Sequence, residues 1–246
     1  MSDTMAPGAT GIVVALASEA RALTTHTVRP ERLTPLSAGA ALYLSGMGPD
    51  AAQRAAHRLA DAGAKALAVF GVAGALDARL RNGSLFCPDH VLDGRGHDYA
   101  ASPSWRTSLQ QRLATMPRPL YMSGSLLTVH EPLLTTSAKT AAHRQHEALA
   151  VDMESAAVAA VANERNLPFV VLRAIVDEVG DTIPTALNHS VDAWGRPRAL
   201  GLIAALCRHP ALLAELPRLY SRMQRATLAL RAAAKATGPA LGWSSS

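Results

Sequence analysis

Short apolar runs alternate with polar or glycine-rich turns along the first two thirds of the chain. They are GIVVALA at residues 11–17, AALYLS at 40–45, KALAVF at 65–70 and FVVLRAIV at 169–176. Runs of this length, bounded by turn residues, are typical of strands that are buried on both faces. The pattern therefore predicts a mostly parallel central sheet.

Helices are expected between these strands. One follows Pro49 and spans residues 50–62, and an alanine-rich one spans 154–166 and ends at Asn-Leu-Pro. Proline suits the first position of a helix and also stops one. Residues 84–92 and 120–128 are further strand candidates, and a short helix is expected near 106–114. The alternation of strands and helices predicts an α/β fold with helices covering the sheet.

The C-terminal part is predicted to be helical from residue 199, with breaks at Pro210 and Pro217. Its last helix has an apolar face beside a stripe of arginines: Leu219, Met223, Ala226 and Leu230, and Arg218, Arg222 and Arg225. Two interpretations stay open. The helix is an ordinary surface helix with solvated arginines, or it contacts a membrane surface or another anionic partner.

Charge is concentrated in this tail. From Arg196 onward there are eight basic residues and one acid, a net charge of +7, which leaves about −2 for the rest of a chain of net charge +5. No nucleic-acid motif is present, so we expect no nucleic-acid partner. Cys87 and Cys207 are too few and too far apart for a disulfide framework. With no signal-peptide pattern and no apolar run long enough for a bilayer, we expect a cytoplasmic protein.

Acidic residues flank the most informative stretch, residues 149–181. Asp152 and Glu154 precede the alanine-rich helix, and Asp177 follows the last predicted strand. Such placement can converge carboxylates on one polar ligand, although acids are equally common at helix starts and turns. Arg173 is the one charge within the buried run and needs an anionic partner.

Three earlier positions also follow strands. Glu19 is either a helix-start acid or a carboxylate at the edge of the sheet. Gly46 and Gly48 form a turn before a helix, which is a weak signal for phosphate or another anion. The sequence Gly71-Val72-Ala73-Gly74 lets a ligand approach the backbone, or simply lets a strand and a helix pack.

Two histidines, His143 and His146, lie on one face of a predicted helix. Two imidazoles so placed are compatible with a metal ion, but no third ligand has a suitable spacing, and solvated helix histidines are the commoner case. We therefore expect no metal and no cofactor.

The ordered motifs GIVVALASEARAL, SGMGPDAAQRAAHRL, LAVFGVAGALDARLRNGSLF and LAVDMESAAVAAVANERNLPFVVLRAIVDEVGD cover residues 11–181. Together they resemble the purine nucleoside phosphorylase and methylthioadenosine/adenosylhomocysteine nucleosidase superfamily. With its arginine-rich tail, the chain is most similar to the hopanoid-associated phosphorylase branch. The resemblance implies a three-layer α/β/α fold with a mixed, mostly parallel sheet. It also implies a catalytic domain at residues 1–198 and a basic helical extension at 199–246 packed on it.

Roles for individual residues are implied by the same resemblance. Asp177 stands where the family protonates N7 of the purine, and Glu154 where it binds the ribose hydroxyls. Met153 would pack against the ribose, and Glu19 would activate water. This chemistry suits the residue types, because a buried acid can stay protonated and a nearby carboxylate can stabilise a developing oxocarbenium ion.

The chain departs from the family pattern at three positions that line the implied substrate site. Val72 and Val176 stand where relatives carry hydroxyl residues, and Leu127 stands near an aromatic position. Residues 71–74 would approach the ribose and the nucleophile. The nucleophile stays open: Glu19 favours water, whereas the Gly46–Gly48 turn and the name of the branch favour phosphate as a co-substrate.

The implied reaction is cleavage of an adenine nucleoside, with adenosylhopane, a lipid, as the expected substrate. The alternatives are a soluble methylthioadenosine or adenosylhomocysteine nucleosidase and a non-catalytic nucleoside-binding protein. A homo-oligomer is expected, as is peripheral attachment to the inner membrane surface through the C-terminal helix.

Overall fold

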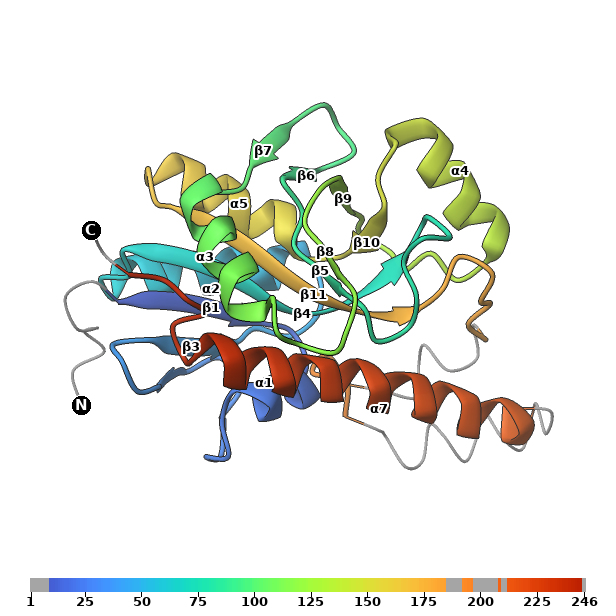
Figure 1. Ribbon diagram of the computed structural model, residues 1–246, viewed down its shortest axis with the longest axis horizontal. Coiled ribbons are helices and arrows are strands. Elements are labelled where there is room, and N and C mark those ends of the chain that lie inside the picture. The colour runs from blue at the N-terminus through green and yellow to red at the C-terminus, as the bar shows by residue number, and fades with distance from the viewer. Residues whose placement is uncertain (1–8, 185–191, 197–207, 209–211, 245–246) are drawn as a thin grey trace.

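The computed structural model describes residues 9–184, 192–196, 208 and 212–244, and helices there cover both faces of one sheet (Figure 1). The strands are β1 (Thr10–Val14), β2 (Leu33–Pro35), β3 (Ala41–Leu44), β4 (Ala66–Ala75), β5 (Leu85–Phe86), β6 (His90–Leu92), β7 (Asp98–Ala100), β8 (Leu120–Tyr121), β9 (Ser125–Thr128), β10 (Ala150–Asp152) and β11 (Phe169–Asp177). The helices are α1 (Ala17–Leu23), α2 (Pro49–Asp61), α3 (Pro103–Leu113), α4 (Thr136–His146), α5 (Ser155–Glu164) and α7 (Leu212–Thr237).

Strand β4 is the centre of the sheet. Its residues 66–69 pair in parallel with β1 on one edge, and residues 67–74 pair in parallel with β11 on the other. On the first edge the partner then changes, because Gly74 and Ala75 pair antiparallel with β10. Within the described chain, residues 70–73 therefore have no strand neighbour on that edge. The sheet is left with a gap, and the candidate site lies there.

The remaining strands extend the sheet in two directions. From β1 it continues to β3 and β2, and from β10 to β9, β6 and β7, while β11 leads to β5 and β8. Six of the ten strand pairings in the described chain are parallel. The predicted mixed, mostly parallel sheet is confirmed. It follows from the almost purely apolar sequences of β4 and β11, which suit strands covered on both faces.

Two apolar clusters bind the layers together. On one face α2 and α5 pack on the sheet through residues such as Leu59 and Val158. On the other face lie α1, α3 and α7, which contribute residues such as Ala20, Trp105 and Leu230. The predicted three-layer α/β/α fold with a C-terminal helix is thus confirmed (Figure 1).

Several predicted elements have different bounds. Residues 71–74, expected to follow a strand, lie within β4, because β11 pairs with it that far. The strand expected at 84–92 is two strands, β5 and β6, separated around Pro88, which has no N–H to donate to a neighbour. The strand expected at 120–128 is likewise split, with Gly124 at φ 107° between β8 and β9.

The predicted break at Pro217 is wrong, because α7 runs through it without interruption. Pro217 is the sixth residue of α7, so the missing N–H removes one hydrogen bond near the N-terminal end of the helix. Burial of Ala226, Leu230 and Ala233 against the sheet holds the rest. Pro210 and the expected domain boundary at residue 198 lie outside the described residues. Across the described ranges, no helix combines the length and the apolar character that crossing a membrane requires.

Candidate active site

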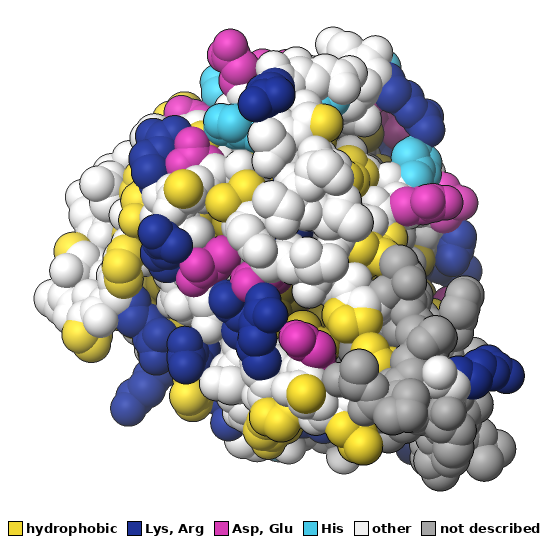
Figure 2. Space-filling model, turned by 90° about the vertical axis from the view of Figure 1, so that its right-hand side faces the viewer, with side chains coloured by type: hydrophobic (Ala, Val, Ile, Leu, Met, Phe, Trp, Pro, Cys, Tyr) yellow, Lys and Arg dark blue, Asp and Glu magenta, His cyan; other side chains and the backbone are white. Residues whose placement is uncertain are grey.

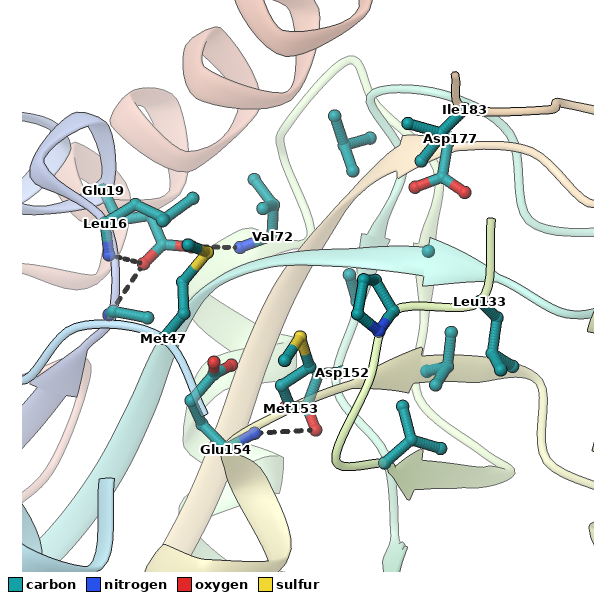
Figure 3. Close-up of a pocket in the computed structure, with 17 residues that line it drawn as sticks. Leu16, Glu19, Met47, Val72, Leu133, Asp152, Met153, Glu154, Asp177 and Ile183 are labelled. Carbon is teal, nitrogen blue, oxygen red and sulfur yellow. Dashed lines mark hydrogen bonds between the residues drawn. The ribbon is translucent and has the colours of Figure 1, made fainter. Parts of the chain in front are cut away.

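A cavity of about 190 Å³ opens beside the gap in the sheet. Four carboxylates reach its wall, those of Glu19, Asp152, Glu154 and Asp177, and they come from different elements (Figure 3). Most of the remaining wall is apolar and includes Leu16, Met47, Val129, Leu133, Val151 and Ile183. The site is thus an apolar chamber with a few acidic groups at fixed places, as is usual for small-molecule sites.

Glu19 occupies the gap left by the missing strand neighbour. It is buried in α1, and its Oε1 accepts a hydrogen bond from the N–H of Val72 on β4, at 2.8 Å. Its Oε2 accepts from the N–H groups of Ala15 and Leu16, at 2.9 and 2.8 Å. Burial raises the pKa of Glu19, against the opposing effects of Arg173 and these N–H groups. Both interpretations of Glu19 therefore hold, because it binds the start of its helix and also faces the cavity.

Glu154 reaches across the cavity instead of capping its own helix. Its Oε1 accepts from the N–H of Gly48 at 3.0 Å, and its Oε2 accepts from Nη2 of Arg173 at 3.1 Å. Burial raises the pKa of Glu154 to about 7; Arg173 lowers it and Asp152 raises it further. The Gly48 N–H, expected to be free for an external anion, is here bonded to a side chain.

Arg173 lies buried beneath these carboxylates and has the anionic partners that its position in a buried strand predicted. Its Nε donates to Oδ2 of Asp152 at 3.0 Å, in addition to the bond with Glu154. Asp152 also accepts from the hydroxyl of Thr128 at 2.7 Å and from the N–H and hydroxyl of Ser155. Asp152 therefore holds β10, α5 and β11 together and has little capacity left for a ligand.

Asp177 ends β11 and faces the cavity from the side of Ile183 (Figure 3). A Cβ built on Gly74 would lie 3.1 Å from each of its carboxylate oxygens, so Gly74 leaves the space that Asp177 occupies. Lys139 donates to its Oδ2 in a short ion pair. Burial raises the pKa of Asp177, although Lys139 acts to lower it.

The structure brings most of the predicted site residues into the cavity wall. These are Glu19, Val72, Ala73, Gly74, Met153, Glu154, Val176 and Asp177. Gly71 lies just behind the wall, where a Cβ would overlap the carboxylate of Glu19 and lie 2.5 Å from Nη1 of Arg173. Gly48 acts through Glu154, whereas Gly46 lies against Ala193 and Trp194.

Leu127, predicted to line the substrate site, does not lie in the wall of this cavity. Leu127 is buried in an apolar cluster with Leu76, Ala148 and Val151. Strand β9, which carries Leu127, pairs with β10 behind the cavity, so Val129, two residues further on, reaches the wall instead. Sequence reasoning also missed Lys139 and Met47. Lys139 gave no signal, whereas Met47 stands between two glycines of a turn already singled out.

No metal-binding group of three or more His, Cys, Asp or Glu occurs among the described residues. His143 Nδ1 lies 2.8 Å from the carbonyl oxygen of Ala148, and its Nε2 lies 3.7 Å from Asp77. The surroundings of His143 are thus those of a helix residue that binds a neighbouring loop. In the described cavity wall, the carboxyls whose pKa is raised are those of Glu19, Glu154 and Asp177.

The fold is similar to that of several solved structures. A putative 5′-methylthioadenosine/S-adenosylhomocysteine nucleosidase from Francisella philomiragia has a TM-score of 0.68 at 18% identity, covering 94% of this chain and 96% of that chain. Futalosine hydrolase of Helicobacter pylori has a TM-score of 0.65 at 16% identity, with 92% and 97% covered. A 5′-methylthioadenosine/S-adenosylhomocysteine nucleosidase from Colwellia psychrerythraea, in complex with adenine, has a TM-score of 0.60 at 20% identity, covering 72% of this chain and 85% of that chain.

The fold is that of nucleoside phosphorylases and nucleosidases, as these likenesses show. The sequence model of the phosphorylase superfamily matches residues 8–209, and the chain belongs to that superfamily. It is thereby an enzyme of the class that transfers the glycosyl group of a nucleoside to phosphate or water. No curated protein sequence matches the chain significantly.

Proposed function

We propose that the chain hydrolyses the N-glycosidic bond of an adenine nucleoside and releases adenine. The observation that carries this proposal is the presence of a raised-pKa acid, Asp177, and a buried carboxylate, Glu19, on different sides of one cavity (Figure 3). Asp177 gives its proton to N7 of adenine, and the electron pair of the breaking C1′–N9 bond passes to the purine. Glu19 takes a proton from the water that attacks C1′.

The choice of water over phosphate follows from the charges around the cavity. Its described wall contains no Lys, Arg or His. The guanidinium of Arg173 is bonded to Asp152 and Glu154, and the Gly48 N–H is bonded to Glu154. In the described wall a phosphate dianion would meet carboxylates without a free cation to offset them, which is unfavourable at short range.

The apolar wall favours a nucleoside with an apolar group at its 5′ position. Leu16, Met47, Leu133 and Ile183 would surround such a group, while Glu154 binds the ribose hydroxyls and Met153 packs against the sugar. We propose adenosylhopane as the substrate, in line with the family resemblance of the whole chain. The alternative is 5′-methylthioadenosine or S-adenosylhomocysteine, which the names of structural relatives specify for those proteins.

Helix α7 supports a peripheral membrane location, but through a different face from the one expected. The predicted apolar face is buried at Ala226 and Leu230, and Arg218 and Arg222 form ion pairs with Asp181. The opposite face exposes Leu213, Tyr220 and Leu228, which are 60%, 68% and 50% exposed. We propose that this outer face contacts the inner membrane surface.

The test of the proposed reaction is adenine release from adenosylhopane, 5′-methylthioadenosine and S-adenosylhomocysteine, with and without phosphate. Hydrolysis predicts equal rates in both buffers and, as the sugar product, the 5′-substituted ribose with a free hydroxyl at C1′. A rate that requires phosphate and yields the 1-phosphate of that substituted ribose would refute hydrolysis. Asp177→Asn and Glu19→Gln should each lower kcat by about 10²- to 10⁴-fold. Unchanged turnover in Asp177→Asn would refute its role as the acid.

A further inference from the structure

Lys139 is the only buried residue of α4, and its exposure is 0%. A helix normally attaches to a domain through apolar side chains, and lysine is almost never fully buried unless it is paired. A buried ammonium group is costly to remove from water, so its partners must offset that cost. The one fully buried side chain of α4 is thus a charged one, which points to a role for its charge.

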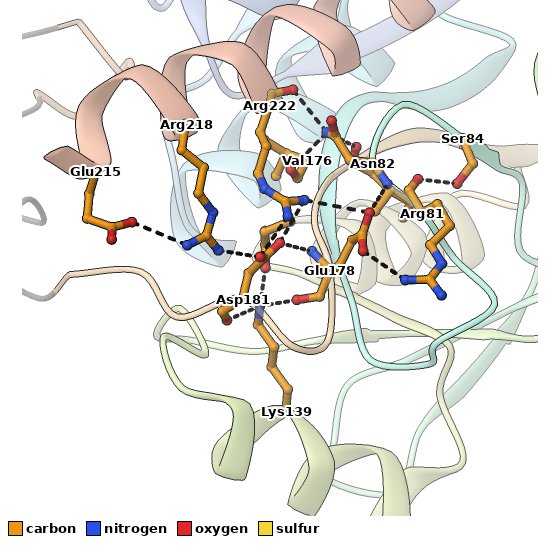
Figure 4. A network of polar contacts seen from close by, with 12 residues as sticks. Arg81, Asn82, Ser84, Lys139, Val176, Glu178, Asp181, Glu215, Arg218 and Arg222 are labelled. Atoms are coloured by element: carbon orange, nitrogen blue, oxygen red, sulfur yellow. Dashed lines mark hydrogen bonds and ion pairs between the residues drawn. The ribbon is translucent and has the colours of Figure 1, made fainter.

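The partners of Lys139 all lie in the segment that begins with Asp177. Its Nζ donates to Oδ2 of Asp177, to the carbonyl oxygen of Glu178 at 2.9 Å and to that of Asp181 at 3.0 Å (Figure 4). These three acceptors use all three hydrogens of the ammonium group. Lys139 is thus held in one position and cannot easily turn towards another partner.

The ion pair holds only one oxygen of Asp177. Among the described residues none hydrogen-bonds the other oxygen, Oδ1, and Asp177 lines the cavity. Lys139 itself is not part of the cavity wall. The arrangement therefore fixes the orientation of the carboxyl group while leaving one oxygen for a ligand.

The segment that follows Asp177 is also held by contacts other than those of Lys139. Asp181 accepts from the N–H of Glu178 at 2.7 Å and from Nη2 of Arg222 at 2.8 Å, while the N–H of Asn82 donates to Glu178 at 3.1 Å (Figure 4). The two carbonyls that bind Lys139 are therefore fixed in place. Lys139 is bound to a rigid frame and not to a loose loop.

We propose that Lys139 is a positioning residue for Asp177, the acid of the reaction. Lys139 orients Asp177 and stabilises the carboxylate that is left when Asp177 gives up its proton. This inference rests on the proposed function. Asp177 transfers a proton from Oδ1 to N7, the C1′–N9 bond breaks, and the electron pair goes to the purine. Lys139 transfers no proton. Its positive charge attracts the new carboxylate, and this attraction lowers the energy of the products of the step.

The test compares the pH dependence of kcat in Lys139→Met, Lys139→Gln and Lys139→Arg, on the adenine nucleoside that the wild-type enzyme cleaves. Arg144→Met is the matched control, because it removes one positive charge from an exposed position of the same helix. Turnover requires protonated Asp177, so kcat is lost as the pH rises through the pKa of Asp177. Removing Lys139 removes an influence that lowers this pKa. The alkaline limb should therefore move to higher pH.

The expected results are specific to the charge. Lys139→Met should lower kcat about 10- to 100-fold and move the alkaline limb upward, with KM changed less than kcat. Lys139→Gln keeps N–H donors but not the charge, so it is the control for a variant that fails to fold. It should show the same upward shift of the alkaline limb. Lys139→Arg should restore part of kcat, and Arg144→Met should match the wild type.

The outcomes separate this inference from the proposed function. If Asp177→Asn is inactive but Lys139→Gln and Lys139→Met keep the wild-type limb and kcat, Lys139 has no role in catalysis and the inference fails alone. If Asp177→Asn keeps wild-type turnover, the acid assignment fails first. In the background of Asp177→Asn, Lys139→Met should cost little more, because the two residues act as one unit.

Discussion

At the scale of single residues, the site depends on a close approach that only glycine allows. Gly71 lies on β4 where the carboxylate of Glu19 and the guanidinium of Arg173 both reach the backbone. Both neighbours are buried and hydrogen-bonded, with exposures of 2% and 1%, so neither can move aside without losing partners. Glycine is therefore required at position 71 because side chains of the site occupy the space of a Cβ, and not because of its backbone conformation.

We predict that Gly71→Ala destabilises the protein by about 1–3 kcal/mol, the usual cost of overfilling a packed interior, and greatly lowers adenine release. Gly180→Ala is the control, because a Cβ there would meet nothing within 4 Å. Urea unfolding and an adenine-release assay measure the two effects. Equal stability and equal activity in both variants would contradict the role given to Gly71.

At the scale of elements, an ion-pair network joins α7 to the segment that follows Asp177, the proposed acid. Asp181 accepts from Nη2 of Arg222 at 2.8 Å, from Nη1 at the same distance, and also from Arg218 (Figure 4). Burial acts to raise the pKa of Asp181, but hydrogen bonds from the Glu178 N–H and from Arg218 hold it below its usual value. The resulting stabilisation is present at neutral pH and is lost as the pH falls through the lowered pKa.

We predict that Arg222→Met lowers the free energy of unfolding by about 1–3 kcal/mol at pH 7, because it removes a two-bond partner from a nearly buried carboxylate. Arg231→Met, at an exposed position of the same helix, should change it by less than about 0.5 kcal/mol. Urea unfolding at pH 7 and at acid pH measures both. The difference between the variants should shrink in acid; a difference that stays constant with pH would contradict the assignment to Asp181.

The same elements show what the sequence could and could not predict. Buried strands such as β4 and β11 have continuous apolar runs, and Asp177 and Glu154 stand beside such runs in an ordered motif. The fold and these two candidate site residues could therefore be predicted from the sequence. Lys139 was not, because the sequence of α4 contains nothing that distinguishes a buried lysine from a solvated one. The wrong break at Pro217 has a similar origin, since packing of distant residues outweighs a local preference.

At the scale of the whole molecule, the described part of the basic tail does not form one positive surface. Figure 2 views the end of the molecule towards the right of Figure 1, and basic side chains alternate there with acidic ones. Two of the arginines expected to bind an anionic partner are bound to Asp181. A membrane contact through α7 must therefore depend on its exposed apolar residues, with Arg225, Arg231 and Lys235 as exposed basic residues that are not paired with Asp181.

We predict that the protein co-sediments with vesicles containing anionic lipid at low salt, and that added salt weakens the binding. The double variant Leu213→Ser/Leu228→Ser should bind several-fold less, because two exposed apolar side chains are lost. Arg218→Met, which breaks an internal ion pair, is the control and should bind nearly as well as the wild type. Absence of binding at low salt would eliminate the membrane proposal.

The gap beside β4 has a consequence for how this site can change by mutation. Because no strand of the described chain covers residues 70–73 on that edge, the carboxylate of Glu19 takes the place of a neighbouring main chain and accepts from the Val72 N–H. Removing a catalytic group commonly stabilises an enzyme, since such groups are held under strain. Loss of Glu19 would instead leave three N–H donors without an acceptor. The proposed general base is thus also a structural part of the sheet, so activity and stability should be lost together.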